Sequence, residues 1–367
     1  MKCSTLPCDL RIGIIGAGQL GLMLFQQGIR LGFKFNVLGK PEDPLCKYTA
    51  CYGEDEYEQF VDDSDIVTFE FEHANGKAME YAQSKGKLKP EINSVNLKRE
   101  REKEFLYLKS IGAPLPKFEI ARDGSEAIEI AKNQFNNNAV IKRSVGGYDG
   151  KGQYFVKNNI ENFNFLKEDK SRFVVVEYVD FDYEASIIVS RGDDRTIYYQ
   201  PSFNLNKKGI LVINYGPLVI PEAKDIGYLI TKSLNYIGTM GIELFVRGRE
   251  VLVNEISPRV HNSGHYTLTS CKHSQFESHL RAISGLGLLE PECNGYFGML
   301  NLLGVQTINS ELDKYGQVFM YNKPGTNPRR KVGHINVTGD SMESVKFKIN
   351  NLINEVYGSL DDLIAKL

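Results

Sequence analysis

The first hundred residues alternate apolar runs with helical stretches, and this order restricts the fold more than any other feature of the sequence. Apolar runs at 11–16 (RIGIIG), 34–39 (KFNVLG) and 65–72 (DIVTFEFE) predict buried strands. Between the first two runs, residues 19–32 (QLGLMLFQQGIRLG) place apolar side chains at helical spacing. Because strands that are joined through a helix pair in parallel, this segment predicts an α/β domain with a Rossmann-like parallel sheet.

The pattern changes near residue 97, where a charge-rich stretch (LKREREKEFLYLKSIG) opens a new helix and indicates a boundary. Short apolar runs at 139–256, joined by hairpin turns and interrupted by a helix near 222–237, predict an α+β domain. A last segment carries a strand (FGMLNLLGV), a loop rich in Pro, Gly and Arg, and one terminal amphipathic helix over 343–367. We therefore expect three domains in the 367-residue chain, at 1–97, 98–293 and 294–367.

Composition and charge exclude several classes of protein. Hydrophobic residues make up 42% of the chain and charged residues 25%, which is typical of a globular protein. A net charge of −2 gives no electrostatic reason to expect nucleic acid or an acidic membrane as a partner. No apolar run approaches the roughly 18–20 residues of a spanning helix, and the first ten residues lack the apolar core of a signal peptide. We expect a cytoplasmic protein that binds neither nucleic acid nor a membrane.

Six cysteines lie at positions 3, 8, 46, 51, 271 and 293. They form no CxxC pair and have no histidines at zinc-ligand spacing, which argues against a structural zinc site. Cys3 and Cys8 share a five-residue spacing with Cys46 and Cys51. Chance or a peripheral pair explains that spacing better than a metal does.

The motif GAGQLG places Gly16, Gly18 and Gly21 after a strand and at the start of a helix. Alone, this motif predicts a dinucleotide with its pyrophosphate on the helix N-terminus. A nicotinamide site also needs an acidic residue about 20 positions later, and that place reads Leu38-Gly39-Lys40. The motif therefore favours some phosphorylated ligand that Gln19 and Leu20 would face, or glycines that only let the helix and strand pack closely.

A second glycine-rich stretch, SVGGYDGKGQ at 144–153, follows the apolar run AVIK. Glycines let backbone N–H groups approach a phosphate closely, and a lysine adds a positive charge. The stretch is not a P-loop, because Val145 occupies the first glycine position and Gly152 follows Lys151. It predicts either a phosphate-binding loop or a flexible hairpin tip.

The stretch IELFVRGREVLVNEI predicts a hairpin that carries two carboxylates. A three-residue turn at 248–250 would pair Arg247 with Val251 and place Glu243 opposite Glu255 on one face. Two like charges about 5 Å apart are destabilising unless something positive lies between them, and Mg²⁺ is usually held by one or two carboxylates plus phosphates. The hairpin therefore predicts a magnesium–nucleotide site, unless a one-residue register shift puts the acids on opposite faces.

The next stretch, SPRVHNSGHYT, carries Arg259 and His261 in a loop, because Pro258 and Gly264 argue against a helix. An arginine and a histidine beside a metal–phosphate site are suited to a small oxyanion. Near the C-terminus, Lys323 and Arg330 lie in a loop that contains two prolines and a glycine. These two cations are suited to a ribonucleotide phosphate or a carboxylated intermediate, or they belong to a solvated basic loop.

Together the motifs resemble one family. The stretches GQLG, VTFEFEH, REKEFL, GGYDGKGQ, VNEISPRVHNSGH, SQFESHLRAISGL and RRKVGH occur in this order from about residue 11 onward. They resemble the 5-(carboxyamino)imidazole ribonucleotide synthases, ATP-grasp enzymes of purine biosynthesis. Members use ATP and bicarbonate to carboxylate the exocyclic amine of aminoimidazole ribonucleotide, which gives ADP and phosphate.

The resemblance implies an ATP-grasp fold, a homodimer, ATP and Mg²⁺ as cofactors, and a set of site residues. Metal ligands would be Glu243 and Glu255, and the catalytic residues would be Asp149, Arg259, His261 and Lys323. The substrate side would comprise Gln19, Leu20, Glu70, Lys323 and Arg330. The nucleotide side would comprise Arg99, Lys142, Gly146, Gly147, Tyr148, Gly150, Lys151, Gly152, Gln153, Glu177, Tyr178, Val179, Glu184, Asn206 and Asn254.

Within that nucleotide set, the resemblance implies that Arg99 and Lys142 contact phosphates, that 177–179 receive the adenine and that Glu184 binds the ribose. The glycine-rich loop would be a lid that keeps water from the presumed carboxyphosphate, with Tyr148 and Asp149 reaching the second substrate. The sequence departs from the family pattern by lacking an arginine after GQLG, an acid before Arg99, a first hinge acid and a histidine before GIL. The residues at those places are Leu22, Lys98, Val176 and Asn206.

We therefore expect an ATP-dependent carbon–nitrogen ligase that acts on aminoimidazole ribonucleotide and bicarbonate. One alternative is another ATP-grasp ligase, such as a formate-dependent glycinamide ribonucleotide formyltransferase. A second alternative is a nucleotide-binding regulatory protein or oxidoreductase, which would bind nicotinamide and would not turn over ATP.

Overall fold

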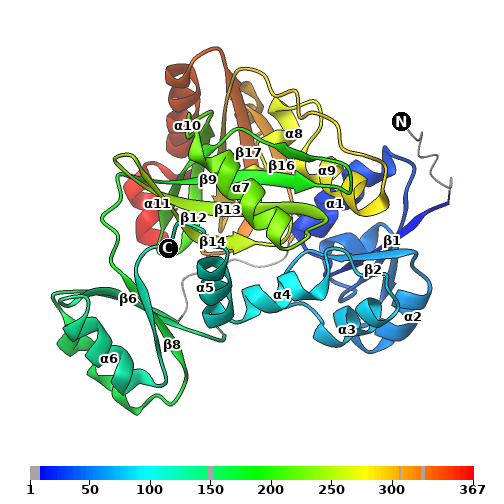
Figure 1. The fold of residues 1–367 in the computed structure, drawn as a ribbon. Helices are drawn as coiled ribbons and strands as arrows, with labels where there is room; N and C mark the ends of the chain where they lie inside the picture. Colours follow the sequence, from blue (N-terminus) through cyan, green and yellow to red (C-terminus); the bar gives the residue numbers. More distant parts are fainter. Residues whose placement is uncertain (1–8, 147–151, 306, 324–326) are drawn as a thin grey trace.

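The computed structural model describes residues 9–146, 152–305, 307–323 and 327–367 and contains three β-sheets (Figure 1). The first sheet is parallel throughout, with the strand order β3-β2-β1-β4, as the alternating sequence pattern predicted. Its elements are β1 (Arg11–Ile15), α1 (Gln19–Ile29), β2 (Lys34–Leu38), β3 (Ala50–Tyr52), α2 (Tyr57–Asp62), β4 (Ile66–Phe69) and α3 (Gly76–Ser84), with 3₁₀ turns η1 (Pro44–Lys47) and η2 (Glu54–Glu56).

Two short helices, α4 (Ile92–Arg99) and α5 (Arg101–Ser110), connect this first unit to the rest of the chain. A small antiparallel sheet of order β5-β8-β6-β7 follows and extends away from the body of the molecule (Figure 1). Buried alanine, isoleucine and valine side chains pack this sheet against α6. Its elements are β5 (Phe118–Ala121), α6 (Gly124–Asn133), β6 (Asn138–Arg143), β7 (Gln153–Lys157), η3 (Ile160–Glu168) and β8 (Phe173–Glu177).

The third sheet has nine strands in the order β14-β13-β9-β11-β12-β15-β17-β16, with β10 paired to β9. Residues from 296 onward continue this sheet, because β15 pairs with both β12 and β17. The strands are β9 (Tyr183–Arg191), β10 (Thr196–Tyr198), β11 (Ser202–Lys207), β12 (Ile210–Gly216), β13 (Gly238–Arg247), β14 (Glu250–Ser257), β15 (Tyr296–Leu303), β16 (Gln317–Met320) and β17 (Lys331–Gly339).

Helices cover this sheet and close two large cores. One core packs α7 against β9 and β13, and the other packs α10 against β15 and β17. The remaining elements are α7 (Glu222–Ser233), η4 (Asn262–Gly264), α8 (Thr267–Ser270), α9 (Gln275–Ser284), η5 (Ser310–Lys314), α10 (Met342–Tyr357) and α11 (Leu360–Lys366). No helix within the described ranges is long and apolar enough to cross a membrane.

The single terminal helix predicted over 343–367 is wrong, because the segment forms two helices. Gly358 takes a positive φ of 87° after α10, and the Ser359 side chain then accepts a hydrogen bond from the Asp362 N–H at the start of α11. Glycine tolerates positive φ, and a serine cap satisfies a free N–H of a helix start. Apolar periodicity continues across this break, so the periodicity alone did not indicate it.

The carboxylate hairpin has a different turn from the predicted one. Arg247 pairs with Glu250, so the turn has two residues, Gly248 (φ 60°) and Arg249, as glycine-first hairpin turns do. The register then shifts by one residue after Glu243, which leaves Asn254 as the extra residue of a β-bulge. The shorter turn and the bulge compensate, so Glu243 faces Glu255 as predicted.

The cysteines form two disulfides among the described residues, Cys46–Cys51 and Cys271–Cys293. The first agrees with a peripheral pair at five-residue spacing, whereas no sequence pattern indicated the second. No cluster of three or more metal-ligating side chains of the His, Cys, Asp or Glu type occurs in the part of the chain that the structure describes. Cys3 and Cys8 lie outside the described residues.

Candidate active site

The predicted carboxylate pair lies among several polar contacts. Glu243 and Glu255 are direct antiparallel partners on β13 and β14, and their side chains keep 20% and 30% of their surface exposed. Burial, with the neighbouring Glu255 charge, raises the pKa of Glu243 to about 8. Burial alone would also raise the pKa of Glu255, but the positive charges of Lys98 and Arg101 outweigh it and hold that pKa at about 2.

Two lysines lie near this pair, and one of them contacts it directly. Lys98 Nζ lies 3.0 Å from Glu255 Oε2 and 3.5 Å from Glu104 Oε2. Lys142 on β6 donates a hydrogen bond to Asn254 Oδ1 at 3.3 Å, so its ammonium group contacts the bulge residue of the hairpin. Burial and the neighbouring Arg101 lower the pKa of Lys142 to about 8, although Glu255 opposes that effect. Lys142, Asn254 and both carboxylates are therefore adjacent, as the resemblance implied.

His261 lies on the other side of the pair. Its Nε2 is 3.3 Å from Glu243 Oε1, and its Nδ1 is 2.8 Å from Ser263 Oγ. The Ser263 backbone N–H also points to Nδ1 at 3.4 Å, which assigns the ring proton to Nε2, where it faces the carboxylate. Burial and the nearby Arg259 lower the pKa of His261 to about 3, so the imidazole is neutral at physiological pH.

Arg259 connects this region to the first domain. Its Nε lies 3.0 Å from Glu72 Oε2, and Glu72 is only 2% exposed. Glu72 follows β4, two residues after Glu70. The predictions chose Glu70 from FEFE and missed Glu72. Two acids at the end of a parallel strand indicated a site at that sheet edge, but not which distant cation each acid would meet.

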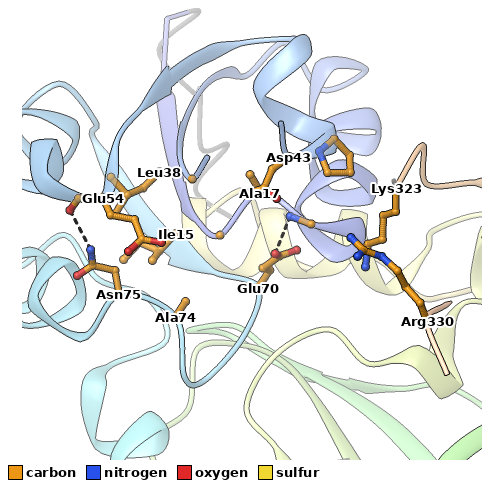
Figure 2. A pocket seen from close by; sticks show the side chains of 14 residues that line it. Ile15, Ala17, Leu38, Asp43, Glu54, Glu70, Ala74, Asn75, Lys323 and Arg330 are labelled. Carbon is orange, nitrogen blue, oxygen red and sulfur yellow. Dashed lines mark hydrogen bonds between the residues drawn. The ribbon is translucent and has the colours of Figure 1, made fainter. Parts of the chain in front are cut away.

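A cavity of about 220 Å³ lies at the carboxyl ends of the parallel strands and contains Glu70, Lys323 and Arg330 in its lining (Figure 2). The Lys323 and Arg330 side chains lie side by side on one wall, and Glu70 faces them. Lys323 also donates to the Gln19 side chain. Burial lowers the pKa of Lys323, with Glu70 opposing that effect. The structure therefore brings together four of the five predicted substrate-side residues.

Glu70 occupies the helix start that GAGQLG alone would offer to a phosphate. The Glu70 carboxyl group accepts hydrogen bonds from the Gly18 N–H at 2.6 Å and the Gly21 N–H at 2.9 Å, at the start of α1. A Cβ at Gly16 or Gly18 would lie 2.6 Å from Glu70 atoms, so these glycines make room for the carboxyl group. This arrangement supports the interpretation of the glycines as close-packing residues, and a phosphorylated ligand at this place stays a prediction.

Leu20 follows Gln19 at the start of α1. Its side chain is 8% exposed and packs in the core that α1 forms with β1, β2 and α9, because an apolar residue at this helix position faces the sheet. Only its backbone is left for contact with a ligand, and that contact stays a prediction.

The predicted nucleotide residues fall into three groups. Asn206 on β11 donates to the Glu184 carboxylate on β9, so the residue at the family's histidine position is beside the expected ribose ligand. At the expected adenine hinge, the N–H groups of Glu177 and Tyr178 donate to the carbonyls of Lys117 and Asn138. The third group flanks the connection between β6 and β7 and consists of Gly146, Gly152 and Gln153. The remaining predicted residues of this stretch lie outside the described residues; they are Gly147, Tyr148, Asp149, Gly150 and Lys151.

Arg99 occupies a position that its predicted role did not suggest. Its guanidinium donates to the Glu72 carbonyl at 2.6 Å and to the Ala74 carbonyl at 3.3 Å. These bonds tie α4 to the loop after β4. The predicted contact of Arg99 with a nucleotide phosphate stays a prediction.

Comparison with known proteins agrees with this architecture. Family models match residues 10–98 as a ribonucleotide synthetase preATP-grasp domain, 106–276 as an ATP-grasp domain, and 298–348 as a phosphoribosylaminoimidazole carboxylase C-terminal domain. The fold and the site thus define an ATP-grasp enzyme with a preATP-grasp domain, and the predicted fold class is confirmed.

Relatives identify the family within that class. An N5-carboxyaminoimidazole ribonucleotide synthase of Saccharolobus solfataricus is 48% identical over 364 residues, which cover 98% of this chain and 100% of the relative. The phosphoribosylaminoimidazole carboxylase ATPase subunit of Aquifex aeolicus has a crystal structure with a TM-score of 0.81 and 34% identity, covering 95% of this chain and 100% of that one. A carboxyaminoimidazole ribonucleotide synthase of Aspergillus clavatus, complexed with ATP, has a TM-score of 0.84 and 25% identity, covering 95% and 98%. The chain belongs to the N5-carboxyaminoimidazole ribonucleotide synthase family, which confirms the resemblance.

Proposed function

We propose that this enzyme uses ATP and bicarbonate to carboxylate aminoimidazole ribonucleotide on its exocyclic amine, giving ADP and phosphate. The observation that carries the proposal is a series of contacts between residues close in sequence, which runs from the cavity to the carboxylate pair. Glu70 lines the cavity, Glu72 pairs with Arg259, His261 meets Glu243, and Glu243 faces Glu255. This order supports a substrate, an oxyanion and a metal–nucleotide site in succession.

The carboxylate pair fits a divalent cation. Glu243 and Glu255 are two acids on directly opposed strand positions, both keep part of their side-chain surface exposed, and Asn254 adds an amide oxygen nearby. Oxygen ligands of this kind suit Mg²⁺, which would neutralise charge on the phosphates of ATP. Lys142, whose ammonium already contacts Asn254, would contact the same phosphates.

Bicarbonate would lie at Arg259 and His261. A bicarbonate oxygen would attack the γ-phosphorus of ATP, ADP would leave, and carboxyphosphate would form. The substrate amine would then attack the carboxyl carbon, or CO₂ released from it, with loss of phosphate and of one amine proton. Because the imidazole of His261 is neutral, Arg259 would supply the positive charge and His261 a donor N–H.

The ribonucleotide would occupy the cavity of Figure 2, with Arg330 and Lys323 toward its phosphate or its transferring carboxyl group. On the nucleotide side, the ribose would meet Glu184 and Asn206, and a hinge donor to adenine would come from Val179, since the preceding two N–H groups are already used. The lid role of the glycine-rich loop and of Asp149, the domain limits at 97 and 293, a homodimer and a cytoplasmic location belong to the same proposal.

The proposal is tested by ADP release from the purified enzyme with bicarbonate or formate, each combined with aminoimidazole ribonucleotide or glycinamide ribonucleotide. We expect ADP release only with bicarbonate and aminoimidazole ribonucleotide together. Release with formate and glycinamide ribonucleotide would favour the formyltransferase alternative. ADP release that does not depend on aminoimidazole ribonucleotide would refute the proposed substrate.

A further inference from the structure

One cation at the carboxylate pair, Lys98, has no role in the function proposed above. Lys98 lies in the last turn of α4, where the family pattern has an acid, and its ammonium lies 3.0 Å from Glu255 Oε2. The Lys98 side chain is only 14% exposed, and its second carboxylate neighbour, Glu104, is 2% exposed. Burying a charged side chain costs desolvation free energy, so a lysine is buried only where opposite charges compensate its own.

The surroundings of Lys98 fix its position. Glu104 on α5 contacts Lys98 and also accepts a hydrogen bond from the Ile256 N–H at 2.8 Å, directly after Glu255. Glu104 therefore binds the lysine and the β14 backbone at the same time. Arg101 is 8% exposed and donates to the Arg143 carbonyl, so its charge acts on Glu255 while its own hydrogen bond goes to another group. Among the residues that the structure describes, Lys98 is the cation that forms an ion pair with Glu255.

We propose that Lys98 is a built-in counter-ion of the metal site, which holds Glu255 in position and competes with the divalent cation for that carboxylate. The inference rests on the proposed function, in which Glu243 and Glu255 bind the metal. Lys98 occupies Glu255 Oε2, which leaves Oε1 as the oxygen of that side chain toward a cation. Its positive charge also offsets one negative charge of the pair.

The physical consequence is a weaker metal site with a fixed geometry. Affinity for a hard divalent cation rises with the negative charge of its ligands, so an ammonium beside one ligand lowers that affinity. The same ammonium offsets the repulsion between two carboxylates that face each other without metal. Lys98 is thus a positioning residue, and its removal should tighten metal binding while it destabilises the metal-free protein.

The test measures Mn²⁺ binding to the full-length, nucleotide-free protein from the electron paramagnetic resonance signal of free Mn²⁺. We expect Lys98→Met to lower the Mn²⁺ dissociation constant by about tenfold or more, whereas Lys98→Arg, which keeps the charge, stays within about threefold of wild type. Lys103→Met is the matched control, because this α5 lysine pairs with Glu100 at 2.7 Å and is 56% exposed. The control should leave the Mn²⁺ affinity unchanged.

A second variant protects the test against a folding failure. Lys98→Met combined with Glu104→Gln removes one charge of each sign, and the glutamine oxygen can still accept the Ile256 N–H. This double variant should fold and should still bind Mn²⁺ more tightly than wild type. Unchanged or weaker Mn²⁺ binding in a folded Lys98→Met or double variant overturns the inference. The separate result that Glu255→Gln binds Mn²⁺ as tightly as wild type refutes the metal site of the proposed function itself.

Discussion

The two members of the carboxylate pair should respond oppositely to the same substitution. Glu243 is the buried acid whose negative charge is opposed by Glu255, whereas the charge of Glu255 is matched by Lys98. Changing Glu243 to Gln removes an unfavourable charge from the metal-free protein. Changing Glu255 to Gln leaves Lys98 with one carboxylate fewer. We therefore expect Glu243→Gln to stabilise the metal-free protein at alkaline pH and Glu255→Gln to destabilise it.

The magnitudes follow from the pKa values. Folding raises the pKa of Glu243 from 4.5 to about 8, so its contribution to stability is complete below pH 4.5 and is lost as the pH rises to about 8. That rise corresponds to an upper limit of roughly 5 kcal/mol, and partial exposure reduces the expected gain of Glu243→Gln at pH 8.5 to about 2 kcal/mol. Folding lowers the pKa of Glu255 to about 2, so its contribution is present above pH 4.5 and is lost as the pH falls through about 2. Glu255→Gln should therefore cost about 2 kcal/mol at pH 8.5.

The assay is urea-induced unfolding in EDTA at pH 8.5 and pH 5, with turnover measured in parallel. The gain from Glu243→Gln should fall below about 1 kcal/mol at pH 5, because the folded Glu243 is then protonated and the pH is only half a unit above the pKa of 4.5 from which the unfavourable contribution accumulates. Both variants should lose more than about 100-fold in turnover with Mg²⁺, since each lacks a metal ligand. Glu250→Gln, on the same hairpin but paired with Arg247 at the surface, is the control. Equal destabilisation by both variants, or near-normal turnover in either, would refute the paired-carboxylate argument.

Three further predictions concern the rest of the site and the fold. Arg330→Ala should raise the KM for aminoimidazole ribonucleotide several-fold and leave the KM for ATP unchanged, whereas Lys323→Ala should lower kcat. If both variants raise only the KM for ATP, this loop belongs to the nucleotide side of the site. Glu72→Gln should leave the buried Arg259 guanidinium unpaired, which should lower the free energy of unfolding by about 3 kcal/mol and raise the KM for bicarbonate. An unchanged KM for bicarbonate would show that this ion pair does not support the oxyanion site. Cys271→Ser should cost about 3 kcal/mol relative to the oxidised protein, because the Cys271–Cys293 bridge closes a segment of 22 residues, and an equal urea midpoint with and without reductant would contradict this.

The hairpin shows which features of a strand pair can be predicted from a sequence pattern and which cannot. Alternation of apolar side chains predicted the two strands and the face on which Glu243 lies, because a strand has a period of two residues. The turn was wrong by one residue, and the bulge at Asn254 was not predicted at all. A bulge depends on what the extra residue meets, and Asn254 meets Lys142, 112 positions earlier in the chain. Local patterns carry no information about such a partner.

The same limit applies to the charged residues. FEFE, REKEFL and the charge-rich stretch near 97 each indicated a site or a boundary, and the resemblance assigned Glu70 and Arg99. The partners of Glu72, Glu104 and Lys98 are set by how α4, α5 and β14 approach one another in three dimensions. These residues look like ordinary surface charges in the sequence, since charge runs are usually exposed. Their burial became evident only from the fold.

GAGQLG shows a different kind of limit. The motif predicts and the structure contains an acidic group at a helix N-terminus, but in the structure this group is a side chain of the protein. The motif predicts an anion at a helix N-terminus, and the structure has one, since the Glu70 carboxylate accepts from Gly18 and Gly21. Glu70 uses these two donors and lies opposite Lys323 and Arg330 in the cavity. In the proposed function, these groups would orient the ligand, with its anionic groups toward the two cations and its amine toward Glu70. That orientation is the one required if the amine is to meet a carboxyl donor held beyond Glu72 at Arg259.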